Sequence, residues 1–162
     1  MAMTMTGDYL LPADRQRVWD ALNDPEILKR CIPGCESLEK SGDSQFAAVA
    51  TAKVGPVKAR FKGHVTLTDL DPPNGYRISG EGTGGVAGFA KGGAKIRLAE
   101  ADGGTRLSYD VEAQVGGKLA QIGQRLINGA AKKIADEFFA NFAKALDPNA
   151  QVPAGSASVG ET

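Results

Sequence analysis

The chain has 162 residues, which is enough for one domain with a substantial core. Its 19 Lys and Arg residues balance 19 Asp and Glu residues, so the composition gives no indication of nucleic-acid binding. No apolar run is long enough to span a bilayer, and the start, MAMTMTGDYLL, lacks the basic and apolar segments of a secretory signal. We therefore expect a cytoplasmic protein whose two cysteines are thiols.

The first 35 residues predict a strand and two short helices. Residues 3–11 form the strand, which ends at Pro12. Residues 13–23 place Val18, Trp19 and Leu22 on one side of a helix. Pro25 opens a second helix, and Pro33 with Gly34 ends it.

After residue 35 the apolar period changes to two, which predicts strands. We expect six of them, at 36–41, 44–54, 57–69, 75–83, 88–100 and 104–115. The connections are too short for parallel crossovers, so the sheet should be an antiparallel meander joined by the first strand. Alternation is clear in 57–67. Every second residue from Val57 to Leu67 shares a buried face, while Lys58, Arg60, Lys62 and His64 lie on the solvent-exposed face.

Residues 118–146 predict one long amphipathic helix that crosses the domain over the buried face of the sheet. Gly123 and Gly129 each cost about 1 kcal/mol in a helix interior relative to Ala. They indicate either close packing or a kink, or else volume left free for a ligand. The remaining residues, 147–162, are rich in Ala, Pro, Gly and Ser, and we expect a disordered polar tail. Residues 1–146 would then form the single folded domain.

Many residues on the predicted inner face are small. Ala48, Ala50, Ala59, Gly63 and Ala94 alternate with large inward side chains. Because protein cores are densely packed, such a face either closes tightly on the helix or leaves an apolar cavity. A cavity of a few hundred Å³ is the usual size of a small-molecule site.

Several motifs point away from catalysis or metal binding. Residues 80–85 match G-x-G-x-x-G, but a glycine-rich strand follows rather than the helix that a dinucleotide site needs. Cys31 and Cys35 bracket a turn without further metal ligands nearby in sequence. The single histidine, His64, has outward parity, and no acid–base pair falls in a cleft.

A basic cluster lies on the outer face of two neighbouring strands. It consists of Lys53, Lys58, Arg60 and Lys62. A solvated face is the simplest interpretation. Docking of an acidic partner or of anionic headgroups remains an alternative.

The order of these elements resembles the helix-grip fold of the START and birch-pollen-allergen superfamily, an α+β fold. In finer detail the chain is similar to the G-subunit family of carbon monoxide dehydrogenase. The similarity rests on four stretches: MTGDYLLPADRQRVWDALNDPEILKRCIPGC at 5–35, KVGPVKARFKG at 53–63, GEGTGGVAGFAKGGA at 80–94 and GKLAQIGQRLINGAAKKIADEFFANF at 117–142.

The resemblance implies a seven-stranded antiparallel sheet wrapped around the long helix, with two short helices after the first strand and an apolar cavity inside. It also implies a non-enzymatic accessory protein of a carbon monoxide dehydrogenase or related molybdenum hydroxylase. The implied ligand is a respiratory quinone, menaquinone or ubiquinone, with no covalent cofactor. Peripheral association with the inner face of the cell membrane would follow, although the polar tail does not resemble an anchor.

We expect the ligand between the sheet and the long helix. The predicted contacts are Phe46, Phe61, Tyr76, Phe89, Tyr109, Ile122, Gly123, Leu126, Gly129, Ala130, Ile134 and Phe138. Gly123 and Gly129 would give the ligand room, and Phe89 would form a lip on the glycine-rich hairpin.

Two other functions remain open at this point. The first is a cyclase-like or hydrolase-like enzyme of the same fold, with Tyr76 or Tyr109 as acid or base. The second is a docking protein with a filled core and no ligand.

Overall fold

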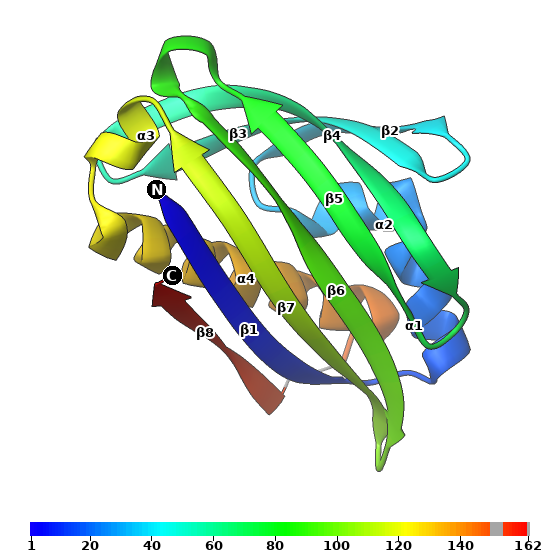
Figure 1. Ribbon diagram of the computed structural model, residues 1–162. Coiled ribbons are helices and arrows are strands. Elements are labelled where there is room, and N and C mark those ends of the chain that lie inside the picture. Colours follow the sequence, from blue (N-terminus) through cyan, green and yellow to red (C-terminus); the bar gives the residue numbers. More distant parts are fainter. Residues whose placement is uncertain (150–153, 162) are drawn as a thin grey trace.

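A single antiparallel sheet wraps around a long helix in the computed structural model, which describes residues 1–149 and 154–161 (Figure 1). The strands are β1 (Ala2–Leu11), β2 (Cys35–Gly42), β3 (Gln45–Val54), β4 (Val57–Asp71), β5 (Gly75–Thr83), β6 (Phe89–Ala101), β7 (Gly104–Gly116) and β8 (Ala154–Glu161). The helices are α1 (Arg15–Leu22), α2 (Pro25–Cys31), the single-turn η1 (Gly85–Ala87), α3 (Lys118–Gln121) and α4 (Gln124–Leu146).

The strand order is β2-β3-β4-β5-β6-β7-β1-β8, and every neighbouring pair is antiparallel. Strands β2 to β7 form the predicted meander, and β1 joins it beside β7. The inner face of the sheet packs on α4, while α1 and α2 cover one end of that face (Figure 1). The predicted seven-stranded helix grip is therefore confirmed.

The structure adds an eighth strand where the sequence predicted disorder. Residues 154–161 form β8, which pairs with the free edge of β1 from Met3↔Glu161 to Leu10↔Ala154. An edge strand offers unpaired backbone groups, so a polar segment without its own apolar pattern can still pair there. The prediction of a disordered tail at 147–162 is wrong for 154–161, and residues 150–153 and 162 lie outside the described residues.

The predicted single helix at 118–146 is broken. α3 ends at Gln121, and α4 begins at Gln124. Gly123 between them has φ +98°, which is unfavourable for any residue with a Cβ. The break turns α3 away from the axis of α4 and packs it against β7 and η1.

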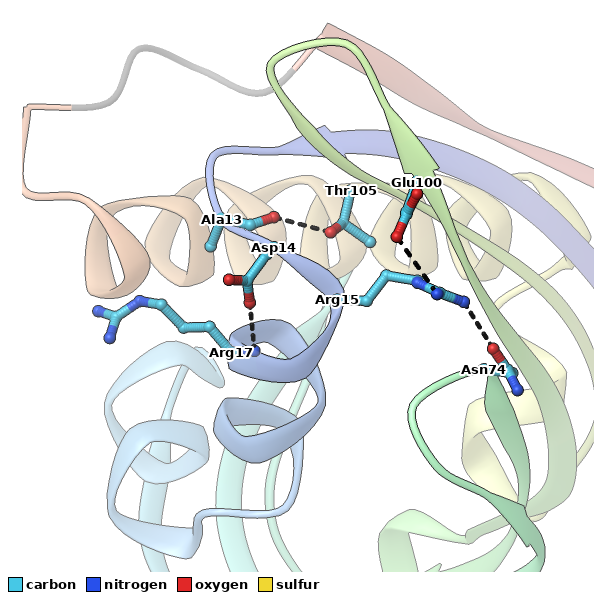
Figure 2. Close-up of polar contacts among 7 residues, drawn as sticks. All are labelled: Ala13, Asp14, Arg15, Arg17, Asn74, Glu100 and Thr105. Carbon is cyan, nitrogen blue, oxygen red and sulfur yellow. Dashed lines mark hydrogen bonds and ion pairs between the residues drawn. The ribbon is translucent and has the colours of Figure 1, made fainter.

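Polar contacts fasten α1 at the end of the molecule opposite α3 (Figure 2). Asp14 caps α1 by accepting a 2.9 Å hydrogen bond from the Arg17 backbone N–H. The Arg15 guanidinium donates to Asn74 Oδ1 at 2.6 Å and to Glu100 Oε1 at 3.3 Å, which joins two strand turns to α1. In the interior, Thr105 Oγ1 donates to the Ala13 carbonyl at 2.7 Å.

The last turn of α4 is held at this end too. Arg17 Nη2 donates a 3.0 Å hydrogen bond to the Leu146 carbonyl. A cation at a helix C-terminus satisfies an otherwise unpaired carbonyl and favours the helix dipole.

Candidate functional site

An apolar cavity of about 570 Å³ lies between the inner face of the sheet and α4. Side chains of the sheet, of α4 and of the α1–α2 pair enclose it. They are Met5, Leu22, Leu28, Ile32, Pro33, Leu38, Phe46, Ala48, Val65, Leu67, Tyr76, Ile78, Ala94, Ile96, Leu107, Tyr109, Val111, Ala131, Ile134, Ala135, Phe138 and Phe139. Among the described residues that line the cavity, Tyr76 and Tyr109 bring hydroxyl groups to it.

Small side chains leave the space open. Ala48 and Ala94 line it from the sheet, and Ala131 and Ala135 line it from α4. A second apolar space of about 400 Å³ adjoins it on the same face, sharing Ala48 and Ala94 and reaching Phe61. The small inward residues predicted from sequence therefore do leave a cavity.

The cavity reaches the surface beside Ile134. This side chain lines the cavity and yet is 42% exposed. Ile32 and Leu38, from the α2–β2 side, line the same cavity. A ligand would therefore pass between α4 and the β2 edge of the sheet.

The structure brings five of the predicted ligand contacts to this cavity. They are Phe46, Tyr76, Tyr109, Ile134 and Phe138. Phe61, Ile122 and Ala130 lie instead in a separate apolar cluster around Val54, Val115 and Ile127, which closes the α3 end of the interior. Phe61 still borders the adjoining space.

The remaining predicted contacts lie away from the cavity. Leu126 is 46% exposed and packs over Gly55, because the break at Gly123 shifts the start of α4. Phe89 is 43% exposed, and its ring lies over Gly116. Gly123 breaks the helix, and Gly129 is exposed with open space around the position of a Cβ.

The contribution of the short helices was missed by the sequence analysis. Leu22, Leu28 and Ile32 line the cavity from α1, α2 and the loop that follows. Their apolar character gave a usable signal, because two short helices beside a curved sheet must cover part of its inner face.

Tyr109 is the polar group of greatest interest in the cavity wall. The residue is 5% exposed, and its hydroxyl makes no hydrogen bond of good geometry to the described residues, although the Tyr9 hydroxyl lies near enough to affect its pKa. Gly7 faces it on β1, where a Cβ would lie 2.7 Å from the Tyr109 Oη. Gly7 thus makes room for the hydroxyl end of this ring.

Beside Tyr109, the hydroxyl of Tyr9 is linked by hydrogen bonds to surface side chains of α4. Tyr9 Oη donates a 2.9 Å hydrogen bond to Asp136 Oδ1, and Lys132 Nζ donates to Asp136 Oδ2 at 2.8 Å. The Lys132 ammonium holds the pKa of Asp136 below its usual range, and the Tyr9 hydroxyl contributes in the same direction.

Burial raises the pKa of Tyr9, Tyr76 and Tyr109 above the usual phenol value. At neutral pH all three hydroxyls therefore remain protonated. In the cavity, the hydroxyls of Tyr76 and Tyr109 are therefore placed as hydrogen-bond donors and not as general bases.

The other candidate motifs do not form a site. Gly80 to Gly85 run from β5 into the single turn η1, so no helix N-terminus faces a phosphate. Cys31 and Cys35 are free thiols, and burial raises the pKa of both. His64 points outward to Glu81, 3.5 Å away. Within the described residues no group of three or more His, Cys, Asp or Glu side chains is placed to hold a metal.

Residues 7–147 match the family model of the carbon monoxide dehydrogenase G-subunit, CoxG. The chain belongs to the CoxG family. A search of curated proteins finds no match. None of the helices in the described part of this CoxG-family chain has the length and hydropathy to cross a membrane.

Solved structures agree with the fold. A conserved protein from Geobacillus kaustophilus is 33% identical, with a TM-score of 0.85 over 94% of this chain and 99% of its own. The ZhuI aromatase/cyclase from Streptomyces sp. R1128 is 13% identical, with a TM-score of 0.67 over 93% of this chain and 97% of its own. Ara h 8.0201 is 17% identical, with a TM-score of 0.61 over 92% of this chain and 100% of its own.

Proposed function

We propose that this CoxG-family protein is a non-enzymatic accessory protein of a carbon monoxide dehydrogenase-type molybdenum hydroxylase. In this proposal it binds a respiratory quinone, menaquinone or ubiquinone, and links the enzyme to the electron acceptor of the membrane. Family membership supports the association with a carbon monoxide dehydrogenase. The apolar cavity of about 570 Å³ is the observation that supports a hydrophobic ligand.

A quinone suits both the apolar lining and the buried hydroxyl of Tyr109. The aliphatic and aromatic wall favours an isoprenoid chain, at roughly 25 cal/mol per Å² of apolar area removed from water. Tyr109 Oη can donate a hydrogen bond to a ring carbonyl, which would satisfy a polar group that is otherwise buried without a partner. The ring and the start of the tail would lie inside, and the rest of the tail would leave beside Ile134.

An enzyme of the cyclase type fits the cavity less well. Among the described residues that line it, the titratable side chains are Tyr76 and Tyr109, and their raised pKa keeps them protonated. The cavity also argues against the alternative of a docking protein with a filled core.

Native mass spectrometry with organic extraction of the purified protein is the first test. A bound mass that extracts as a quinone would support the proposal. A protein that is empty and also fails to take up added quinone would contradict it.

A fluorescence titration locates the ligand. Trp19 is the single tryptophan, and its ring lies edge-on to Tyr76, with the centroids 5.3 Å apart. Because Tyr76 lines the cavity, a bound short-chain ubiquinone should quench Trp19 emission. We expect Ala48→Phe, which fills the cavity, to weaken quinone binding at least tenfold.

The matched control is Ala47→Phe on the same strand. Ala47 is exposed on the opposite face of β3, so this variant should bind quinone as the wild type does. Equal affinity of Ala48→Phe and wild type would place the ligand outside the cavity.

A further inference from the structure

One end of the molecule is rich in lysine, and the acidic residue that β8 brings there is Glu161, opposite Met3. This lysine end is defined by residues 1–7, 53–62, 82–91 and 113–126, which contain no Asp or Glu. Strand register brings them together, because Ala2 pairs with Gln114, Lys62 with Thr83 and Phe89 with Gly116. Figure 1 shows the N-terminus, α3 and the β5–β6 connection at this same end.

Most cations at the lysine end have no acidic partner. Lys53 and Lys58 stand directly opposite each other on β3 and β4, an arrangement in which like charges repel. The other cations of these segments are Arg60, Lys62, Lys91, Lys118 and Arg125. Arg60 pairs with Glu36 at 2.9 Å. None of the other six lies within 4.0 Å of a carboxylate in the part of the chain that the structure describes.

Six of the 19 acidic residues lie at the opposite end of the strands. They occupy the turns that the strands make there and the start of α1. These are Asp14, Asp43, Asp69, Asp71, Glu100 and Asp102. Cations at that end have acidic partners, because Arg15 pairs with Glu100 and Arg77 with Asp69. The two ends therefore differ in charge balance, which would orient the molecule on a charged surface.

Apolar side chains project from the lysine end. Val86, at the tip of η1, is 85% exposed, and the partly exposed Phe89 follows it. Glycines flank Val86, with φ +63° at Gly85 and +115° at Gly88. η1 contacts both α3 and β4, so this tip lies next to the lysine-bearing segments.

We propose that the lysine end docks on a bilayer containing anionic lipid, with Val86 inserted among the headgroups and the lysines contacting phosphates. Lysine acts as a point charge suited to a diffuse anionic surface. By contrast, lysine is depleted from protein–protein interfaces. A single protruding Val, rather than a flat aromatic patch, also favours a lipid surface over an acidic protein.

The surface lies on the way to the cavity. Leu126, Ala130 and Ile134 are spaced by four along α4 and share one side of it. Leu126 is at the lysine end, and Ile134 is at the cavity opening. A hydrophobic ligand leaving the bilayer would therefore follow an apolar stripe along α4. This path rests on the proposed function. The docking surface is argued independently, from the charge and exposure of its residues.

Vesicle sedimentation without any quinone tests the docking surface. The protein should bind vesicles of phosphatidylglycerol and phosphatidylcholine, and should bind pure phosphatidylcholine far less. Binding should weaken from 50 to 300 mM salt. Lys53→Glu with Lys58→Glu should lower the partition coefficient by about 30-fold or more, and Val86→Asp should lower it severalfold.

Two control variants carry matched changes elsewhere. Lys40→Glu with Lys144→Glu makes the same change in net charge at exposed positions outside the lysine end. Leu70→Asp changes an apolar side chain that is also exposed, next to the β4–β5 turn. Both should bind the vesicles like wild type.

Equal loss in the controls, or full binding by the test variants, would overturn the proposed surface. Absence of vesicle binding by the wild-type protein would also overturn it. This includes the outcome in which the protein binds an acidic protein partner but no vesicles. Quinone quenching of Trp19 is measured separately without vesicles, so failure of docking and failure of the proposed ligand are distinguishable.

Discussion

Tyr9 and Tyr109 bring two hydroxyl groups into an otherwise apolar interior. The rings stack on Phe139, with centroids 4.1 Å and 5.7 Å from it. Tyr9 donates a hydrogen bond to Asp136, whereas the Tyr109 hydroxyl has no partner among the described residues. Two tyrosines with similar burial therefore contribute differently to stability.

Replacing each tyrosine by Phe should separate these contributions. Tyr9→Phe loses a hydrogen bond to a charged group, and the free energy of unfolding should fall by about 1–2 kcal/mol. Tyr109→Phe removes a buried unpartnered hydroxyl, so the protein should be as stable as wild type or slightly more stable. Urea denaturation measures both. A large loss of stability in Tyr109→Phe would mean that its hydroxyl is bonded in the empty protein.

Asp136 gives a pH-dependent prediction. Its pKa is lowered in the folded protein, first by Lys132 and then by Tyr9. Because the Asp136 pKa is lower in the folded protein, the ionised carboxylate stabilises the fold at pH values above its pKa in the unfolded chain, which is about 4. This contribution disappears as the pH falls through the folded pKa.

Lys132→Met should raise the Asp136 pKa, measured by NMR titration, by more than Tyr9→Phe does. Because the pair is half-exposed, the stability difference from wild type at pH 7 should be only a few tenths of a kcal/mol. It should vanish as the pH falls through the lowered pKa that Asp136 has in the folded protein. An unchanged Asp136 pKa would show that the ion pair is absent in solution.

At the level of elements, the break between α3 and α4 determines which residues reach the cavity. The apolar periodicity of 118–146 continues through the break, so it predicted one helix and assigned Ile122, Leu126 and Ala130 to the ligand. The positive φ of Gly123 shifts the start of α4 and leaves Leu126 over Gly55. Apolar periodicity indicates which side of a helix is buried, but it does not indicate where the helix axis changes direction.

The two glycines should respond to alanine in opposite ways. Gly123→Ala forces a Cβ into positive φ, and we expect a loss of about 1 kcal/mol in the free energy of unfolding. Gly129→Ala lies in an exposed helix interior with open space at the Cβ position, and should gain about 0.5–1 kcal/mol. Thermal unfolding of both variants tests the pair, and similar changes of the same sign would argue for a continuous helix.

At the scale of the whole molecule, the cavity lies within the larger of two apolar clusters. That cluster includes Trp19, Phe46 and Phe142, and the other surrounds Val54 and Ile127 at the α3 end. The second cluster packs separately from the cavity wall, so it supports the fold while the cavity stays open.

This arrangement predicts that a ligand stabilises the protein by mass action. A hydrophobic quinone at 100 times its Kd should add about 2.7 kcal/mol and raise Tm by several degrees. Ala48→Phe, with quinone binding weakened at least tenfold, should lose at least half of the shift at the same ligand concentration, while its ligand-free Tm stays near that of the empty wild-type protein. A shift of equal size in this variant would place the stabilising ligand elsewhere.

The sequence by itself determined the order and type of the elements, because alternation and helical periodicity report directly which side of each segment is buried. It therefore predicted the meander, the inner face with Phe46, Tyr76 and Tyr109, and the small residues that leave a cavity. The tertiary structure decided what depends on segments meeting across the fold. These are the break at Gly123, the pairing of β8 with β1, the cavity wall from α1 and α2, and the gathering of lysines at one end. Sequence periodicity does not encode these features, because each arises from the relative placement of segments distant in the chain.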